Sequence, residues 1–177
     1  MKDKTYIRAL MDYNKWANGV VYQSVSELPQ DEVTKERPNL MKSMLGALNH
    51  LLTVDMIWMA HLEGRDHGMP ELRPMLHDNL DDLWDARKAM DDKILAYIDA
   101  LDPDALEEEV DYELIGGNKG RLSRAMILTH LATHGCYHRG WVADMYGQLP
   151  QIPPIFDIPV YERARREPDG ETLTPLP

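Results

Sequence analysis

The sequence predicts an all-α fold: a four-helix bundle with a short β-hairpin or extended crossover between the third and fourth helices. The first observation is that apolar residues recur at three- and four-residue spacing over four stretches of helical length. These stretches cover residues 4–27, 43–63, 78–101 and 123–146. The second is that apolar and acidic residues alternate over 110–114 and lead into a glycine-rich turn at 116–120, the pattern of paired strands. Four such helices are typical of a bundle.

The first two helices have recognisable ends. Pro29 ends the first helix, because proline disfavours helical geometry in the residue before it. Ser43 has the side chain of a helix N-cap, and Gly64 follows the last apolar residue of the second helix, as a C-terminal glycine does. Residues 29–42, between the two helices, are expected to form a loop.

The third and fourth helices are delimited by the same kinds of residue. Asp78 or Asn79 is expected to cap the third helix, and Pro103 follows its end. Ser123 is expected to cap the fourth helix, which runs to about Gly147. The glycines between these helices have the spacing of a turn and not that of a phosphate-binding loop.

The chain is long enough for one hydrophobic core. With 177 residues it needs no disulfide or other covalent link to hold such a core together. We therefore expect a single bundle domain over residues 1–165 and a proline-containing C-terminal tail over 166–177. Residues after Pro168 are expected to be disordered.

Composition and charge exclude several classes of partner. A formal charge of −11 repels nucleic-acid phosphates and anionic lipid surfaces, so we expect neither as a partner. No apolar run approaches the length of about 20 residues that spans a bilayer, and no targeting segment is recognisable. A single cysteine, Cys136, excludes an internal disulfide and agrees with a reducing compartment. We expect a cytoplasmic protein.

Three histidines, His130, His134 and His138, recur at every fourth position of the fourth helix. Residues four apart lie on one helical face, so two of these rings can close on one metal ion. All three cannot, because His130 and His138 are about 12 Å apart along the helix axis. The spacing therefore predicts one chelating pair, with a further ligand from elsewhere. The alternative is that the three are exposed polar residues or core histidines bonded to their neighbours.

His50 lies in the middle of the strongly apolar second helix. A buried imidazole needs a polar partner, and that partner could be a backbone carbonyl or a metal. Metal sites in helix bundles are built from side chains of facing helices, which makes His50 the natural third ligand. Three neutral histidines leave a coordination position open, and that is the pattern of a catalytic site.

Three stretches, 13–18, 43–52 and 130–140, resemble the DinB/YfiT-like family of metalloenzymes, which is unrelated to the DNA polymerase of similar name. The likeness extends over nearly the whole chain to about residue 165. It implies that a divalent ion of the zinc or nickel kind is held by the histidines at 50, 134 and 138, with the one at 130 outside the ligand set. It also implies a homodimer, which the apolar surplus of the first two helices supports.

Four further side chains are expected in the substrate pocket or just behind it. They are His130, Tyr137, Arg139 and Trp141. Trp141 departs from the family pattern, because glutamine is common after the His-Arg-Gly sequence. Cys136 lies about 200° around the helix from His134 and is expected to be a small core residue. No residue is assigned a catalytic role.

The expected chemistry is transfer or use of a low-molecular-weight thiol on a small electrophilic substrate. Members of the wider superfamily use such thiols, for example bacillithiol or mycothiol. The residues favour this reading, because Gly135 stands where the His-Glu-x-x-His motif of metalloproteases has its glutamate. A metal-bound thiol becomes a thiolate without a protein base.

Two alternatives remain open. The protein could be a metal-dependent hydrolase, or a metal-dependent binding or stress-response protein without enzymatic activity. Di-iron chemistry is disfavoured, since the Glu-x-x-His motif of ferritin-like bundles is absent from the sequence.

Overall fold

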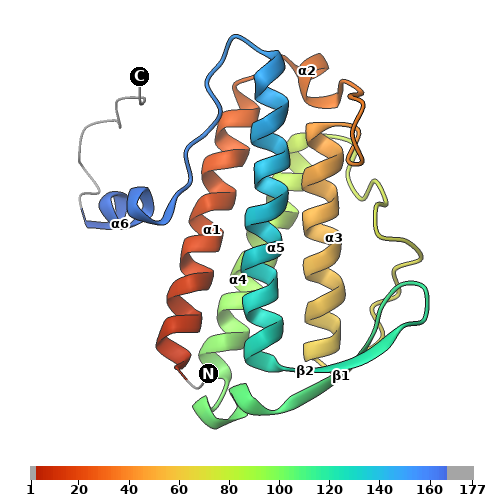
Figure 1. Ribbon diagram of the computed structural model, residues 1–177, viewed down its shortest axis with the longest axis vertical. Coiled ribbons are helices and arrows are strands. Elements are labelled where there is room, and N and C mark those ends of the chain that lie inside the picture. The colour runs from red at the N-terminus through yellow and green to blue at the C-terminus, as the bar shows by residue number, and fades with distance from the viewer. Residues whose placement is uncertain (1–2, 167–177) are drawn as a thin grey trace.

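The computed structural model describes residues 3–166, in which four long helices form a bundle (Figure 1). The long helices are α1 (Lys4–Ser26), α3 (Met44–Leu62), α4 (Leu80–Ala100) and α5 (Arg124–Met145). The predicted all-α bundle is confirmed, and each helix ends close to its predicted limits. Among residues 3–166, no helix combines the length and apolar character that crossing a membrane requires.

Shorter helices fill the connections and the end of the described chain. They are α2 (Gln30–Thr34), the 3-10 helices η1 (Pro103–Glu107) and η2 (Tyr146–Gln148), and α6 (Ile158–Arg166). The short helix α2 lies where only a loop was expected; its acidic first turn suits a helix N-terminus. Helix α6 ends one residue beyond the predicted domain limit at 165. The expected disorder after Pro168 concerns residues outside the described part.

The predicted hairpin is present between α4 and α5. Strands β1 (Glu109–Glu113) and β2 (Lys119–Ser123) pair antiparallel, with Tyr112 opposite Gly120. Their turn needs glycine, because Gly116 and Gly117 have φ angles of 107° and 88° in the left-handed region. The hairpin crosses the ends of α3 and α5 (Figure 1).

The predicted caps fix where the helices begin. Ser43, Asn79 and Ser123 each accept a hydrogen bond from the backbone N–H three residues further on, at 3.0, 2.9 and 3.3 Å. Asn79, and not Asp78, is therefore the cap of α4. These bonds satisfy N–H groups that have no partner inside the helix.

Helix α3 is the most buried of the long helices. Only Gly46, Met56 and His61 along its length are not buried. A helix that is apolar all round belongs in the core, so its few polar side chains must find partners there. Two of them, Asn49 and His50, are adjacent and lie 1% and 6% exposed.

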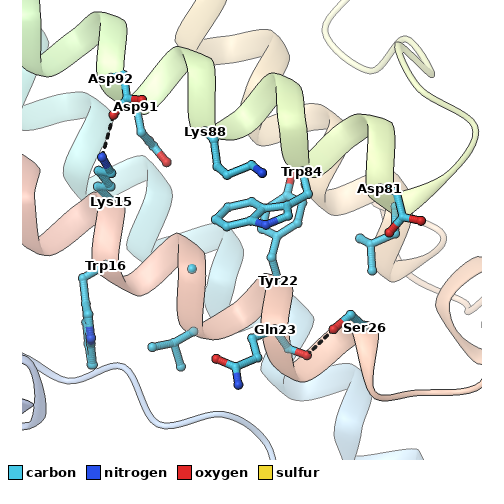
Figure 2. Close-up of a pocket in the computed structure, with 13 residues that line it drawn as sticks. Lys15, Trp16, Tyr22, Gln23, Ser26, Asp81, Trp84, Lys88, Asp91 and Asp92 are labelled. Carbon is cyan, nitrogen blue, oxygen red and sulfur yellow. Dashed lines mark hydrogen bonds and ion pairs between the residues drawn. The ribbon is translucent and has the colours of Figure 1, made fainter. Parts of the chain in front are cut away.

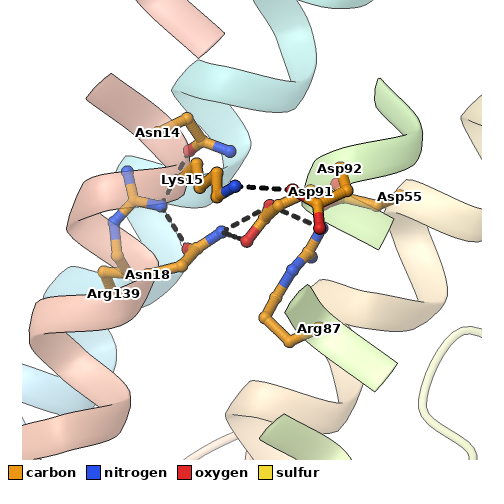
Figure 3. A network of polar contacts seen from close by, with 8 residues as sticks. All are labelled: Asn14, Lys15, Asn18, Asp55, Arg87, Asp91, Asp92 and Arg139. Atoms are coloured by element: carbon orange, nitrogen blue, oxygen red, sulfur yellow. Dashed lines mark hydrogen bonds and ion pairs between the residues drawn. The ribbon is translucent and has the colours of Figure 1, made fainter. Parts of the chain in front are cut away.

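A buried polar network joins the four long helices (Figure 3). Arg139 of α5 donates to Oδ1 of Asn18 at 2.7 Å, and the amide nitrogen of Asn18 donates to Asp91 at 3.0 Å. Arg87 of α4 lies between Asp91, at 2.9 Å, and Asp55 of α3, at 2.6 Å. Two carboxylates thus balance two guanidinium groups, which limits the unfavourable free energy of burying them. The network fixes α3 and α5 relative to each other.

Candidate metal centre

His50 of α3 meets His134 and His138 of α5 in the core of the bundle. One nitrogen from each ring lies within 4.8 Å of the other two, and no other such group of three is found in residues 3–166. Ligands at about 2.0–2.1 Å from a tetrahedral ion lie about 3.4 Å apart. The rings would therefore have to move inward by less than about 1 Å to bind one.

The loop before α4 orients the ring of His50. Nδ1 of His50 lies 2.7 Å from the carbonyl oxygen of Leu72, so Nδ1 carries the proton and donates it to that oxygen. Nε2 is then the unprotonated nitrogen, which is the form that binds a metal. Burial lowers the pKa of His50 and favours its neutral form.

The rings of His134 and His138 are short of hydrogen-bond partners. Within residues 3–166, Nδ1 of each is buried and unpartnered. Burial lowers the pKa of His134 to about 3 and that of His138 to about 4, so both rings are neutral near pH 7. Neutral imidazoles with buried, unpartnered nitrogens fit a divalent ion that prefers nitrogen ligands, such as zinc or nickel.

His130 stands apart from this group. Its ring lies 5.4 Å from that of His134 and 5.2 Å from that of Trp58, measured between centroids. The spacing argument left two possible pairs on α5, and the structure brings His134 and His138, not His130, next to His50.

A cavity of about 590 Å³ opens beside the histidines. Its walls come from α3, α5, the hairpin and the loop before α4, and they are mainly apolar. They include Val54, Trp58, Leu72, Leu114, Leu122 and Met126. His130 and Tyr137 also line it, whereas no aspartate or glutamate among residues 3–166 does. We call this cavity the histidine pocket.

The chain matches the family model described as "DinB family" over residues 1–171. It belongs to the DinB family. The chain is 22% identical to "Protein DinB" of Bacillus subtilis (strain 168) over 158 residues, covering 86% of this chain and 91% of that protein. A crystal structure of a DinB-like protein from Bacillus cereus ATCC 10987 superposes with a TM-score of 0.59 and 14% identity, covering 81% of this chain and 91% of the other. The predicted resemblance is confirmed, and this structural likeness concerns the fold.

Arg139 lies elsewhere in this DinB family member than the sequence suggested. It is fully buried and donates to Asn14 and Asn18 of α1, at 2.8 and 2.7 Å, instead of lining the histidine pocket. The rings of Tyr13 and Phe156 lie 6.0 and 5.7 Å from its guanidinium carbon. The reason is helical geometry, because Arg139 is about 100° around α5 from the preceding histidine.

Trp141 lies just behind the site, and Cys136 differs from expectation. Trp141 does not line the histidine pocket but packs on the core, with its ring 6.3 Å from that of His138. Cys136 is exposed, and not a core residue, because it lies on the solvent side of α5. Tyr137, by contrast, is 61% exposed and stands at the rim of the pocket.

Gly135 explains in physical terms why this DinB sequence has no metalloprotease glutamate. A Cβ atom there would lie 2.6 Å from Oδ1 of Asn14 and 2.8 Å from Nη1 of Arg139. The hydrogen bond between those two side chains passes over the glycine. A glutamate at this position would collide with the buried network, so the position cannot supply a general base to the pocket.

Sequence reasoning missed the loop residues that border the site. Asn49, next to His50, donates from its amide to the carbonyl of His77 and accepts from the N–H of His77, both at 3.0 Å. Arg73 lies on the anchored part of this loop and lines the pocket. The signal in the sequence was the pair of adjacent polar residues, Asn49 and His50, in an apolar helix. Only His50 was considered as a site residue.

A second hollow of about 680 Å³ lies between α1 and α4 and shares no lining residue with the histidine pocket (Figure 2). Tyr22 and Trp84 stack in it with their ring centroids 4.7 Å apart. Its two lysines are paired, Lys15 with Asp92 at 2.5 Å and Lys88 with Asp85 at 2.7 Å. It has the composition of a helix-packing groove, and its described residues include no group of three ligands close enough to share one ion.

Proposed function

We propose that this DinB family protein holds a divalent ion through His50, His134 and His138 and uses a low-molecular-weight thiol on a small electrophilic substrate. The observation that carries the proposal is the composition of the histidine pocket, in which three neutral imidazoles face apolar walls without a carboxylate. Hydrolysis by a metal-bound water is assisted by a general base, and the pocket offers no aspartate or glutamate for that role.

A bound divalent ion would supply Lewis acidity and lower the pKa of a thiol below its free value of about 8.5. The protein's own residues then have two tasks. The apolar walls around Trp58 and Met126 accommodate the apolar part of a substrate. His130 and Tyr137 place a ring nitrogen and a hydroxyl in the pocket, where they can bond to the electrophile.

The proposal is tested with cobalt in place of the native ion. Addition of a small thiol should produce a sulfur-to-metal charge-transfer band in the near ultraviolet, and the band should be absent in His138→Ala. The Arg166→Gln variant is a suitable control, since this exposed residue of α6 pairs with Glu162 outside the pocket.

Two other outcomes would replace the proposal. Absence of a band with every thiol tested, together with metal-dependent cleavage of esters or amides, would identify a hydrolase. Metal binding with neither thiol binding nor turnover would identify a binding protein.

A further inference from the structure

The loop between α3 and α4 is fastened to α3 directly behind the metal-binding group. Asn49 bonds both backbone polar groups of His77, and its amide nitrogen also lies 3.1 Å from the sulfur of Met75. His50 holds the carbonyl of Leu72 at 2.7 Å. Two adjacent residues of one buried helix therefore fix the stretch from Leu72 to His77 against the pocket. These contacts hold both ends of the stretch next to α3.

Arg73 follows Leu72 in this fastened stretch and lines the histidine pocket. His50, His134 and His138 line the same cavity, so the Arg73 side chain and the three imidazoles border one space. The side chain is exposed at the rim, where it can meet a ligand that enters from solvent.

Within the part of the chain that the structure describes, the guanidinium of Arg73 has no protein partner. Among residues 3–166, it has no hydrogen bond and no ion pair. This is unusual in a chain with 30 acidic and 19 basic residues. Other arginines have acidic partners, for example Arg37 with Glu32, Arg65 with Glu63, and Arg124 with Glu108. An uncommitted guanidinium in a pocket without carboxylates is available for a ligand.

We propose that Arg73 is a specificity-determining residue that binds a carboxylate on the small ligand of the histidine pocket. The ligand class, which rests on the proposed function, is a thiol that carries a carboxylate. A guanidinium pairs with a carboxylate through two parallel hydrogen bonds, which fix the orientation of the ligand as well as its charge. The sulfur then points to the histidines, and the apolar walls contact the carbon chain between the two ends.

The test compares three thiols of similar size that differ in charge: 3-mercaptopropionate, 2-mercaptoethanol and cysteamine. Each is titrated into the cobalt-substituted protein, and the charge-transfer band gives its dissociation constant. We expect the wild type to prefer 3-mercaptopropionate over 2-mercaptoethanol by about tenfold, the effect of one charged hydrogen-bond pair. Arg73→Gln should remove this preference and leave binding of 2-mercaptoethanol unchanged.

Two control variants separate charge recognition from damage to the loop. Arg73→Lys should keep part of the preference, because it retains the charge but loses the paired geometry. Arg166→Gln should behave as the wild type. Metal content should be equal in all variants. Equal affinities of the wild type for the three thiols, or an equal loss for all three in Arg73→Gln, would overturn the role of Arg73.

A second arm uses butyrate, which has the carboxylate but no sulfur, with binding measured by calorimetry. If no thiol gives a band but butyrate binds and Arg73→Gln weakens it at least fivefold, the carboxylate subsite stands and belongs to the electrophile, while thiol use is refuted. If no thiol gives a band and butyrate binding does not depend on Arg73, both the subsite and the thiol function are refuted.

Discussion

Gly135 of α5 and Asn14 of α1 are in contact with no room for a side chain between them: a Cβ atom on Gly135 would lie 2.6 Å from Oδ1 of Asn14. That oxygen accepts a hydrogen bond from Arg139 at 2.8 Å. The glycine between two histidines of the candidate metal site is thus required by the packing of two helices. Gly135 therefore connects the histidine site to the polar network on the other side of α5.

Gly135→Ala should therefore destabilise the protein, although alanine is the better helix former. The methyl group displaces a hydrogen bond of a buried guanidinium, and the net loss should be about 1–2 kcal/mol in the free energy of unfolding, measured in urea. Gly140→Ala is the matched control on the same helix. Nothing lies within 4 Å of its added Cβ, so we expect no loss and a gain of up to about 1 kcal/mol. A stabilised Gly135→Ala would show that the network relaxes freely.

Removal of single histidines should separate ligands from neighbours. Alanine at position 50, 134 or 138 should abolish retention of zinc or nickel through dialysis, measured by elemental analysis. His130→Ala should weaken retention only slightly, since its ring packs against Trp58 outside the group of three. If His130→Ala loses the metal while His138→Ala keeps it, the chelating pair on α5 has been misassigned.

Asp91 should give the stability a specific pH dependence. Burial raises the pKa of its carboxyl from 3.8 to about 6. Between about pH 4 and 6 the folded protein therefore binds a proton here that the unfolded chain does not, so lowering the pH through this window stabilises the folded state. Relative to Asp91→Asn, the wild type should gain stability from about pH 7 to about pH 5, as measured by urea unfolding.

The exposed Asp111 is the control residue for that experiment. The hydrogen bond from Arg121 lowers the pKa of its carboxyl, the opposite direction to Asp91. Asp111→Asn should therefore show no such gain for the wild type on acidification. A wild-type advantage over Asp91→Asn that stays constant with pH would mean that Asp91 remains ionised throughout.

The expected homodimer remains a prediction, and the structure changes its basis. The apolar residues of α3 pack inside the bundle and are not available for a dimer interface, because nearly all of that helix is buried. Apolar surface is left beside α1 and α6, where Tyr6 and Ile158 are 56% and 55% exposed. Light scattering should give twice the chain mass of 20.4 kDa, and Ile158→Asp should shift it toward one chain mass. A monomer mass for the wild type at micromolar concentration would rule out the dimer.

The sequence could predict those features that are encoded by residues close together in the chain. Ser43 and Ser123 mark helix starts because a cap bonds to a group three residues away, and the alternation around Tyr112 marks a strand for the same local reason. The pairing of His50 with α5 required only that a buried histidine in a bundle face another helix.

The features that sequence reasoning missed depend on long-range placement. Arg73 reaches the pocket because its loop is fastened to Asn49 and His50, and nothing in residues 64–79 encodes that attachment. The prediction for Cys136 was wrong because its angle around the helix from His134 shows only that its side chain points away from the histidines. That angle does not show whether this side of α5 faces the core or solvent. On α5 that side is solvent.

The ionic network across the four helices contains none of the three histidines of the candidate metal site. The four helices are therefore joined by core contacts that need no ion, unlike a zinc finger, where the ion itself drives folding. An imidazole-only ligand set discriminates little among late first-row metals and follows their general affinity order. For such a site, the ion that would be bound depends on which divalent ions are available to the folded chain as well as on their affinities.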